Sequence, residues 1–310
     1  MRTASLLAAL TAVLTVTTAC GSGQAGPAGA QGGKTDITAA MYPLQWLAER
    51  IGGPDATVTA LTKPGVEPHD LELSPVQVAG IEETGLVVYV KDVQPAVDEA
   101  VEQHAAGRGL DVASLVKTIP SSPSSPSSAG EQDGGETGDA AHDPHVWLDP
   151  SRMATIATKL GDRLAEADPA HAKGYRDRAA ATVADLTTLD GEMSRGLSGC
   201  SSTAIVTSHA AFGYLADRYK LRQIGINGID PETEPSPARL AEVAKVAKQE
   251  KVTTIFSEAL VSPKVAEVLS TEIGARTAVL DPVESQPANG DYLSAMRQNL
   301  SALQTALGCS

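Results

Sequence analysis

Short apolar runs rich in β-branched residues alternate along the chain with longer segments of helical periodicity. Such short runs are typical of buried strands, and apolar residues spaced three or four apart are typical of helices. In the first part of the chain the pattern predicts strands over Ile37–Met41, Thr57–Leu61 and Leu86–Val90. It predicts helices over Leu44–Ile51, Pro75–Glu83 and Pro95–His104.

The same alternation returns in the last third of the chain. Strands are predicted over Ala204–Thr207, Leu221–Ile226, Thr253–Phe256 and Thr277–Leu280. Helices are predicted over Phe212–Tyr219, Ala238–Gln249, Pro263–Ile273 and Tyr292–Ala306. Because strand–helix alternation favours parallel sheets covered on both faces, we expect an α/β fold with two parallel-sheet lobes.

The segment between these two blocks has no strand character. Its apolar periodicity predicts helices over Ser151–Ala165 and Ala170–Leu197, with a break at Asp168 and Pro169. A long helix that joins two lobes is a stiff connector, which limits large hinge motion. We therefore predict an N-terminal α/β lobe over 35–150, a helical connector over 151–197 and a C-terminal α/β lobe over 198–310.

The N-terminus has the pattern of an export signal. Arg2 supplies a short positive region, and the apolar run Leu6–Val16 is too short to span a bilayer. The small residues before Cys20 resemble the lipobox of bacterial lipoproteins, in which that cysteine is acylated. The lipobox has Leu, Val or Ile where this chain has Thr17, so an ordinary secretory signal is the alternative.

We therefore predict a signal peptide over 1–19 and a lipid-anchored, flexible tether over 20–34, which is rich in Gly, Ala, Ser and Gln. Either type of signal places the mature chain outside the cytosol. With lipidation of Cys20 it is attached to the cell membrane, and without lipidation it is secreted or periplasmic.

Two further cysteines, Cys200 and Cys309, remain once Cys20 is assigned to the anchor. In an oxidising compartment two remaining cysteines predict a disulfide, here between the start of the C-terminal lobe and the end of the chain. Two buried free thiols are the alternative. A metal role is not indicated, because neither cysteine lies in a Cys-x-x-Cys or Cys–His spacing.

One segment is of low complexity. Ser121–Ser128 contains only serine and proline, and acidic residues follow it. Such a composition cannot bury apolar surface, so we expect a disordered loop over about 119–142 within the first lobe. Weak attraction of cations by this loop is one hypothesis, and an inert solvated loop is the other.

The charge of the chain excludes one class of partner. Its formal net charge is −14 and its aromatic content is 3%. A surface of this sign does not attract nucleic acid by long-range electrostatics, and few aromatic residues are available to stack on bases. We expect no nucleic-acid partner.

Side chains that can bind a metal ion follow several predicted strands. His69 and His209 each lie in a loop after a strand, Asp281 directly follows another, and Glu258 lies just past a fourth. His145 lies where the predicted disorder ends. Ligands of open parallel sheets bind beyond the carboxyl ends of the strands. Imidazole and carboxylate groups suit zinc, manganese or iron, so the pattern favours a metal site.

Several motifs, in this order, resemble those of the metal-binding lipoproteins of bacterial ABC transporters for zinc and manganese, the ZnuA/TroA-like solute-binding proteins. The resemblance covers about residues 36–308 and implies a metal site in the cleft between the two lobes. The matching segments are Glu67–Pro75, Asp143–Pro150, Thr207–Leu215, Gly225–Asp230, Glu234–Pro237, Phe256–Glu258, Leu280–Pro282 and Asp291–Met296.

The resemblance implies that His69, His145 and His209 are metal ligands. Family members that favour manganese generally carry a carboxylate at the position of His209, and a third imidazole suits zinc. Zinc members often carry a histidine-rich loop before the second ligand, whereas here His142 is the only histidine of that loop.

The sequence leaves two carboxylates as candidates for the fourth ligand. Asp281 matches a carboxylate that several members use, and Glu67 is the competing candidate because some zinc members use water or a Glu near the first histidine. Glu258 is assigned to the cleft or to the groups that surround the ligands, where carboxylates can orient imidazoles.

These inferences predict a binding protein and not an enzyme. We expect a monomer, attached to the membrane through its lipid anchor, that captures extracytoplasmic Zn(II) and delivers it to the membrane permease of an ABC importer. A manganese-specific protein of the same family is the first alternative. A zinc-dependent hydrolase is another, but the chain lacks an HExxH motif. Adhesion is suggested only by the Ser/Pro-rich insertion.

Overall fold

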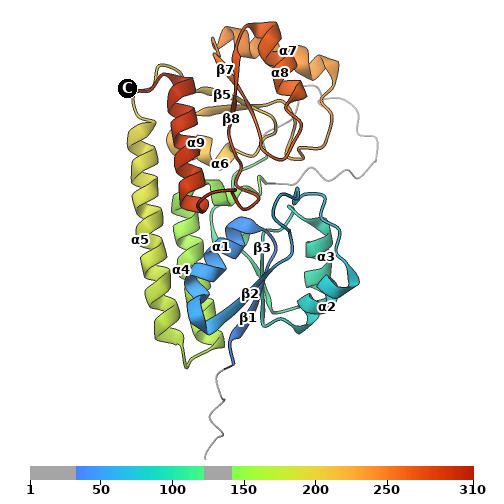
Figure 1. Ribbon diagram of the computed structural model, residues 1–310, viewed down its shortest axis with the longest axis vertical. Helices are drawn as coiled ribbons and strands as arrows, with labels where there is room; N and C mark the ends of the chain where they lie inside the picture. Colours follow the sequence, from blue (N-terminus) through green and yellow to red (C-terminus); the bar gives the residue numbers. More distant parts are fainter. Residues whose placement is uncertain (1–32, 122–141) are drawn as a thin grey trace, which may run out of the picture. The chain divides into compact units, whose positions relative to one another are not determined.

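Two sheets of four parallel strands each form the framework of the protein (Figure 1). The computed structural model describes residues 33–121 and 142–310. The predicted signal peptide with Cys20, nearly all of the tether and most of the predicted 119–142 loop lie outside the described residues. Within the described residues, no helix is both long enough and apolar enough to cross a membrane.

The N-terminal sheet has the strand order β2-β1-β3-β4. Alternate residues of β3 face opposite sides of this sheet, as the period of two requires. Leu86 and Val88 pack with α1, whereas Val87 packs with α2 and α3. The elements are β1 (Thr35–Ala39), α1 (Tyr42–Gly52), β2 (Ala56–Ala60), α2 (Pro75–Glu83), β3 (Leu86–Tyr89), α3 (Pro95–His104) and β4 (Gly109–Asp111).

The C-terminal sheet has the order β6-β5-β7-β8, so each lobe places its strands in the same relative order. Val206 and Ile255 pack with α7 and α8, and their neighbours Ile205 and Phe256 face the other side. The elements are β5 (Ala204–Thr207), α6 (Gly213–Tyr219), β6 (Arg222–Gly225), α7 (Pro237–Gln249), β7 (Thr254–Ser257), α8 (Lys264–Ile273), β8 (Arg276–Val279) and α9 (Tyr292–Leu307).

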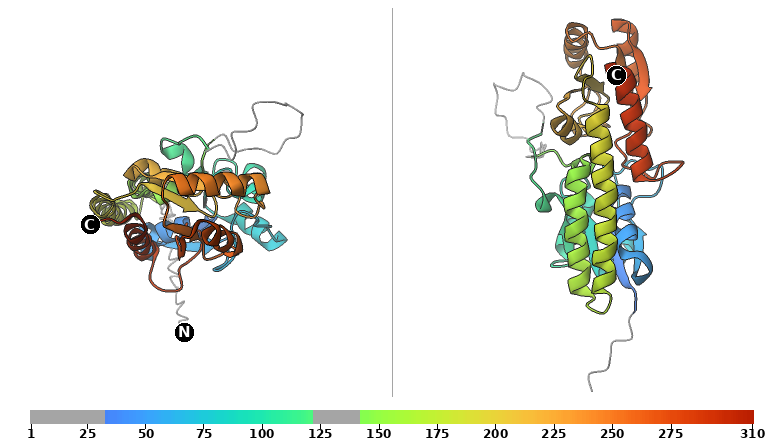
Figure 2. Two further views of the ribbon diagram at one scale, coloured as in Figure 1. Left: turned by 90° about the horizontal axis from the view of Figure 1, so that it is seen from above. Right: turned by 90° about the vertical axis from the view of Figure 1, so that its left-hand side faces the viewer.

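Two helices connect the lobes, α4 (Pro150–Ala167) and α5 (Ala172–Gly196), and they run side by side (Figure 2). Their close approach depends on Gly161, where an added Cβ would lie 2.6 Å from the Cβ of Ala179. Helix α5 packs on α1 of the first lobe and on α9 of the second. The connector is therefore a structural support for both lobes.

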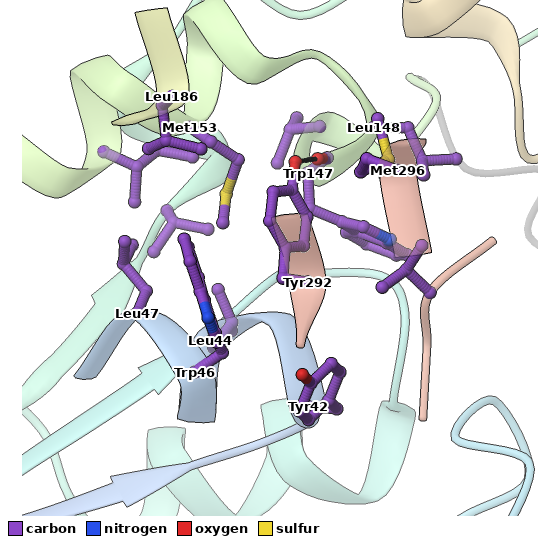
Figure 3. Close-up of a cluster of buried hydrophobic side chains, with 14 of the residues drawn as sticks. Tyr42, Leu44, Trp46, Leu47, Trp147, Leu148, Met153, Leu186, Tyr292 and Met296 are labelled. Carbon is purple, nitrogen blue, oxygen red and sulfur yellow. Dashed lines mark hydrogen bonds between the residues drawn. The ribbon is translucent and has the colours of Figure 1, made fainter. Parts of the chain in front are cut away.

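One hydrophobic cluster extends through both lobes and the connector. Figure 3 shows part of it, in which Trp46 of α1 stacks at 4.8 Å between ring centroids on Tyr292 of α9. Tyr292 donates a hydrogen bond of 2.5 Å to the backbone oxygen of Trp147. The Trp147 indole in turn donates to the backbone oxygen of Pro282 at 2.7 Å. A shared core with buried hydrogen bonds holds the lobes in one arrangement.

The predicted α/β fold is confirmed, with strands and helices close to the expected positions. Strand β4 was not predicted, because its three residues, Gly109–Asp111, carry no apolar run. It pairs only with β3 at the edge of the sheet. The break between the connector helices falls at Asp168 and Pro169, as expected.

The disulfide between Cys200 and Cys309 is present, with an S–S distance of 1.99 Å and a sequence separation of 109 residues. It joins the segment before β5 to the segment after α9. The backbone amide of Ser202 also donates to the oxygen of Leu307 at 3.1 Å. The C-terminus is thus held against the start of the second sheet.

We expect the Cys200→Ser/Cys309→Ser double variant to unfold at a lower temperature than the wild type. A cross-link over a loop of this length stabilises by about 4–5 kcal/mol in the loop-entropy model, chiefly by restricting the unfolded chain. Thermal unfolding of both proteins measures the difference. Peptide mapping without a reductant is the control, and recovery of unlinked Cys200 and Cys309 peptides from the wild type would contradict the prediction.

Candidate metal centre

Four side chains from loops of both lobes converge on one point. His69 lies in the loop after β2, and His145 immediately precedes a 3-10 turn before α4. His209 follows β5, and Glu284 lies in the loop after β8. One ligand atom from each of the four lies within 4.8 Å of the others. Three of these loops leave the carboxyl ends of parallel strands, where ligands of such sheets bind.

The distances between the side chains match the edges of a metal polyhedron. Oε1 of Glu284 lies 3.6 Å from Nε2 of His69, 3.5 Å from that of His145 and 3.8 Å from that of His209. Zinc–ligand bonds of about 2.0–2.1 Å give a tetrahedron with edges of about 3.3–3.4 Å. The three distances that meet at Glu284 are therefore close to the edges of a tetrahedral zinc site, and all four ligand atoms lie within 4.8 Å of one another.

The converging atoms have no other partner. Nε2 of His69, His145 and His209 and both carboxylate oxygens of Glu284 are buried without a hydrogen bond. Buried polar atoms are nearly always hydrogen-bonded, and leaving one unpaired costs about 1–3 kcal/mol. Four of these five atoms, the three Nε2 atoms and Oε1 of Glu284, lie close to one another, which indicates that a cation satisfies them.

Because the group is buried, the electrostatic interactions among its side chains are strong. Glu284 is 1% exposed, His145 and His209 are fully buried, and the His69 side chain keeps 8% of its surface exposed. Burial favours the neutral acid of Glu284, but the imidazoles around it outweigh that effect and hold its pKa below the ordinary value. A carboxylate in this position favours positive charge beside it.

Asp143 orients the ring of His145. Its Oδ1 lies 2.8 Å from Nδ1 of His145 and also accepts the backbone amide of that residue at 2.9 Å. Burial opposes protonation of the ring, but the hydrogen bond to Asp143 and the nearby Glu284 raise the pKa of His145 to about 9. Because Nδ1 is engaged, Nε2 is the atom that faces the centre.

Glu258 plays the same part for His209 from the other lobe. It lies directly after β7, and its Oε1 is 2.8 Å from Nδ1 of His209 and 3.2 Å from the backbone nitrogen of that residue. Burial opposes protonation of His209, but the Glu258 carboxylate outweighs it and raises the pKa of the ring. A carboxylate behind each ring fixes its tautomer and makes it a stronger donor to a metal.

Glu67, the alternative fourth ligand, lies outside the group of four. Its Oε1 accepts the backbone amide of His69 at 3.2 Å. Burial and, next, the nearby charge of Glu284 raise the pKa of Glu67 to about 8. The protonated form that this favours adds no negative charge to the centre at neutral pH.

Asp281, the other expected fourth ligand, is also absent from the group, and Glu284 occupies that place. The Oδ1 atom of Asp281 accepts the backbone amide of Val283 at 2.7 Å. Glu284 was missed because two carboxylates follow β8 in one short loop, and only the backbone path decides which of them faces the imidazoles. The signal available in the sequence was a second acid three residues beyond Asp281.

This donor set can bind a divalent cation. Three imidazole nitrogens and one carboxylate provide four ligands, the number that closed tetrahedral zinc sites use. Manganese favours a larger share of oxygen donors, so the set suits zinc better.

The chain is similar to proteins that are named for zinc binding and zinc uptake. The zinc-binding lipoprotein AdcA of Streptococcus pneumoniae is 34% identical over 287 residues, which are 88% of this chain. The chain spans only 56% of the length of that relative. The high-affinity zinc uptake system protein ZnuA of Bacillus subtilis is 33% identical over 304 residues, which cover 93% of each protein.

The fold is shared with solved structures. Zn(II)-bound AdcA from Streptococcus pneumoniae superposes with a TM-score of 0.73 at 32% identity, covering 89% of this chain and 58% of the other. The family model described as "Zinc-uptake complex component A periplasmic" matches residues 37–306. Since that match includes both lobes and all four converging side chains, the chain belongs to the ZnuA family.

Proposed function

We propose that this protein captures Zn(II) outside the cytosol and delivers it to the membrane permease of an ABC importer. The observation that carries the proposal is the set of five buried, unpartnered atoms of His69, His145, His209 and Glu284. Their spacing of 3.5–3.8 Å around Glu284 suits a tetrahedral ion. The names of the relatives, which describe zinc binding and zinc uptake, support the same cargo.

In this proposal the three imidazoles bind zinc through Nε2, and Glu284 is the fourth ligand. Asp143 and Glu258 hold two of the rings from behind. The four protein ligands leave no coordination position for a reacting water, which catalytic zinc sites keep open. Binding and transport are therefore favoured over hydrolysis.

Membership of the family supports the proposed location and partner. A component of a zinc-uptake complex needs a permease to carry the ion across the membrane, and the word "periplasmic" in the family description supports a location outside the cytosol. The relative named as a lipoprotein supports acylation of Cys20, which lies outside the described residues. The adhesion hypothesis depended on the insertion at 121–128. Only the first residue of this insertion, Ser121, is among the described residues.

We expect the purified protein to bind one zinc ion per chain, and His209→Ala or Glu284→Gln to weaken binding by more than about 100-fold. The loss of a ligand should exceed the 10–100-fold loss that removal of an outer partner causes. Competition with a chromophoric chelator measures the affinity. His104→Ala, which changes a histidine on α3 outside the metal group, is the matched control.

Manganese should compete poorly in the same titration. Equal affinity for the two ions would contradict the zinc assignment, and unchanged zinc affinity in both ligand variants would contradict the site itself.

Zinc binding should release protons at neutral pH, and the apparent affinity should rise between pH 6 and pH 9. The pKa of His145 is raised to about 9, so the metal-free ring holds a proton below that pH and must lose it to bind zinc. Calorimetry in buffers of different ionisation enthalpy counts the protons released. A zinc affinity that is flat over this range, with no buffer dependence of the heat, would refute the expectation.

Glu258→Leu should weaken zinc binding by about 10–100-fold, because His209 loses the acceptor that fixes its tautomer. Glu258→Gln keeps an oxygen acceptor at the same place and should lose less. The matched control is Glu272→Gln, which alters an exposed residue that pairs with Lys248. Equal zinc affinities for wild type and Glu258→Leu would show that Glu258 does not act through the ring.

A further inference from the structure

The four-residue turn from Asp281 to Glu284 brings the buried carboxylate of Glu284 to the metal centre. Within it, Val283 adopts a φ of 58°, in the left-handed region. That conformation is rare for any residue other than glycine, and for a β-branched residue it is a genuine outlier. Val283 is fully buried, so the conformation is part of the packed interior.

The Asp281 side chain holds this conformation. Its Oδ1 accepts the backbone amide of Val283 at 2.7 Å. A short carboxylate that binds the amide two residues ahead forms an Asx-turn, which directs the chain into a tight reversal. One of the two carboxylate oxygens of Asp281 is thus committed to the backbone next to Glu284, and Asp281 lies outside the group of four converging side chains.

The backbone of Asp281 is fixed in turn by helix α9. The Asn299 side chain, which is 2% exposed, accepts the amide of Asp281 through Oδ1 at 2.9 Å. Its Nδ2 donates to the backbone oxygen of Asp281 at 2.6 Å. The Asn299 side chain therefore binds both the backbone amide and the backbone oxygen of Asp281, and it anchors the start of the turn.

The next residue of the turn is fixed by the segment that carries His145. The indole of Trp147 donates to the backbone oxygen of Pro282 at 2.7 Å. Trp147 lies two residues after His145, and the two rings are 5.0 Å apart between centroids. The turn that carries one converging group is therefore bonded to the segment that carries another.

We propose that Asp281 is a positioning residue that holds Val283 in its left-handed conformation and thereby aims Glu284 at the metal, and that it is not itself a ligand. This inference rests on the proposed function, zinc capture by the three histidines and Glu284. In this proposal the hydrogen bond between Asp281 and Val283 sets the geometry of the fourth ligand. The contacts of Asn299 and Trp147 with the turn support that hydrogen bond.

Two substitutions at Asp281 separate positioning from ligation. Asparagine retains an oxygen that can accept the Val283 amide, but it is a much poorer metal ligand than a carboxylate. We expect Asp281→Asn to bind zinc with nearly wild-type affinity. Asp281→Ala removes the acceptor and should bind about 10–100-fold more weakly, as the loss of a supporting partner does.

Changing Val283 tests the conformation directly. Glycine adopts positive φ without a steric penalty, so Val283→Gly alone should bind zinc much as the wild type does. In the Asp281→Ala/Val283→Gly double variant the turn no longer needs the side-chain acceptor, and we expect recovery of most of the lost affinity. A purely structural loss at Asp281 would not be rescued in this way.

The coordination itself is read from the visible spectrum of the Co(II)-loaded proteins, with Glu284→Gln as the reference for a lost carboxylate. We expect Asp281→Asn and the double variant to give the wild-type spectrum and Asp281→Ala to shift toward the reference. Thermal unfolding of the metal-free proteins checks the fold. If Asp281→Ala does not fold, the asparagine and glycine variants still decide the question.

Two results would overturn the proposal. A loss in Asp281→Asn as large as that in Glu284→Gln would make Asp281 a ligand. Wild-type affinity and spectrum in Asp281→Ala would show that the turn forms without it. Failure of the wild type to bind zinc would instead refute the proposed function, and the two failures are distinguishable.

Discussion

The confinement of Glu284 among three imidazole nitrogens is the constraint on which the rest of the site depends. Its two oxygens and the three Nε2 atoms are buried with no hydrogen bond. Each unpaired atom carries a desolvation cost, and a buried charge without a partner carries a larger one. The structure must therefore hold these atoms together against that cost until a cation satisfies them.

The rigidity that this requires comes from the connection between the lobes. Helix α5 packs on α1 and on α9, and a single hydrophobic cluster continues across both lobes. The Trp147 indole bonds Pro282 while its backbone oxygen accepts the Tyr292 hydroxyl, so the ligand loops are fixed to the core and not only to their own strands. Large hinge opening would break this shared core, and small movements of loops would not.

The sequence was sufficient for the fold and for three of the four converging groups. The strand pattern placed His69 and His209 each beyond the carboxyl end of a strand, one in each lobe. The family resemblance then implied that they and His145 share one site between the lobes. Glu284 could not be placed there, because its direction depends on a left-handed valine that no propensity favours. Asp281, nearer to the strand, looked equally suitable. Strand β4 was missed for a simpler reason, because its three residues have no apolar pattern.

The buried acids around the centre reduce the change in its net charge when zinc binds. Asp143 and Glu258 each pair with one imidazole, and they raise the pKa values of His145 and His209 against the effect of burial. Without metal, the shift at His145 to about 9 favours a proton on that ring at neutral pH. Zinc displaces that proton from Nε2, so one of the two positive charges that the ion brings replaces a charge already present. Glu67, with a pKa of about 8, contributes no further negative charge at neutral pH. Because one proton leaves and Glu67 adds no negative charge, the net charge of the centre rises by less than the two charges of the ion. The interior that encloses the centre therefore accommodates a smaller change in charge when zinc arrives.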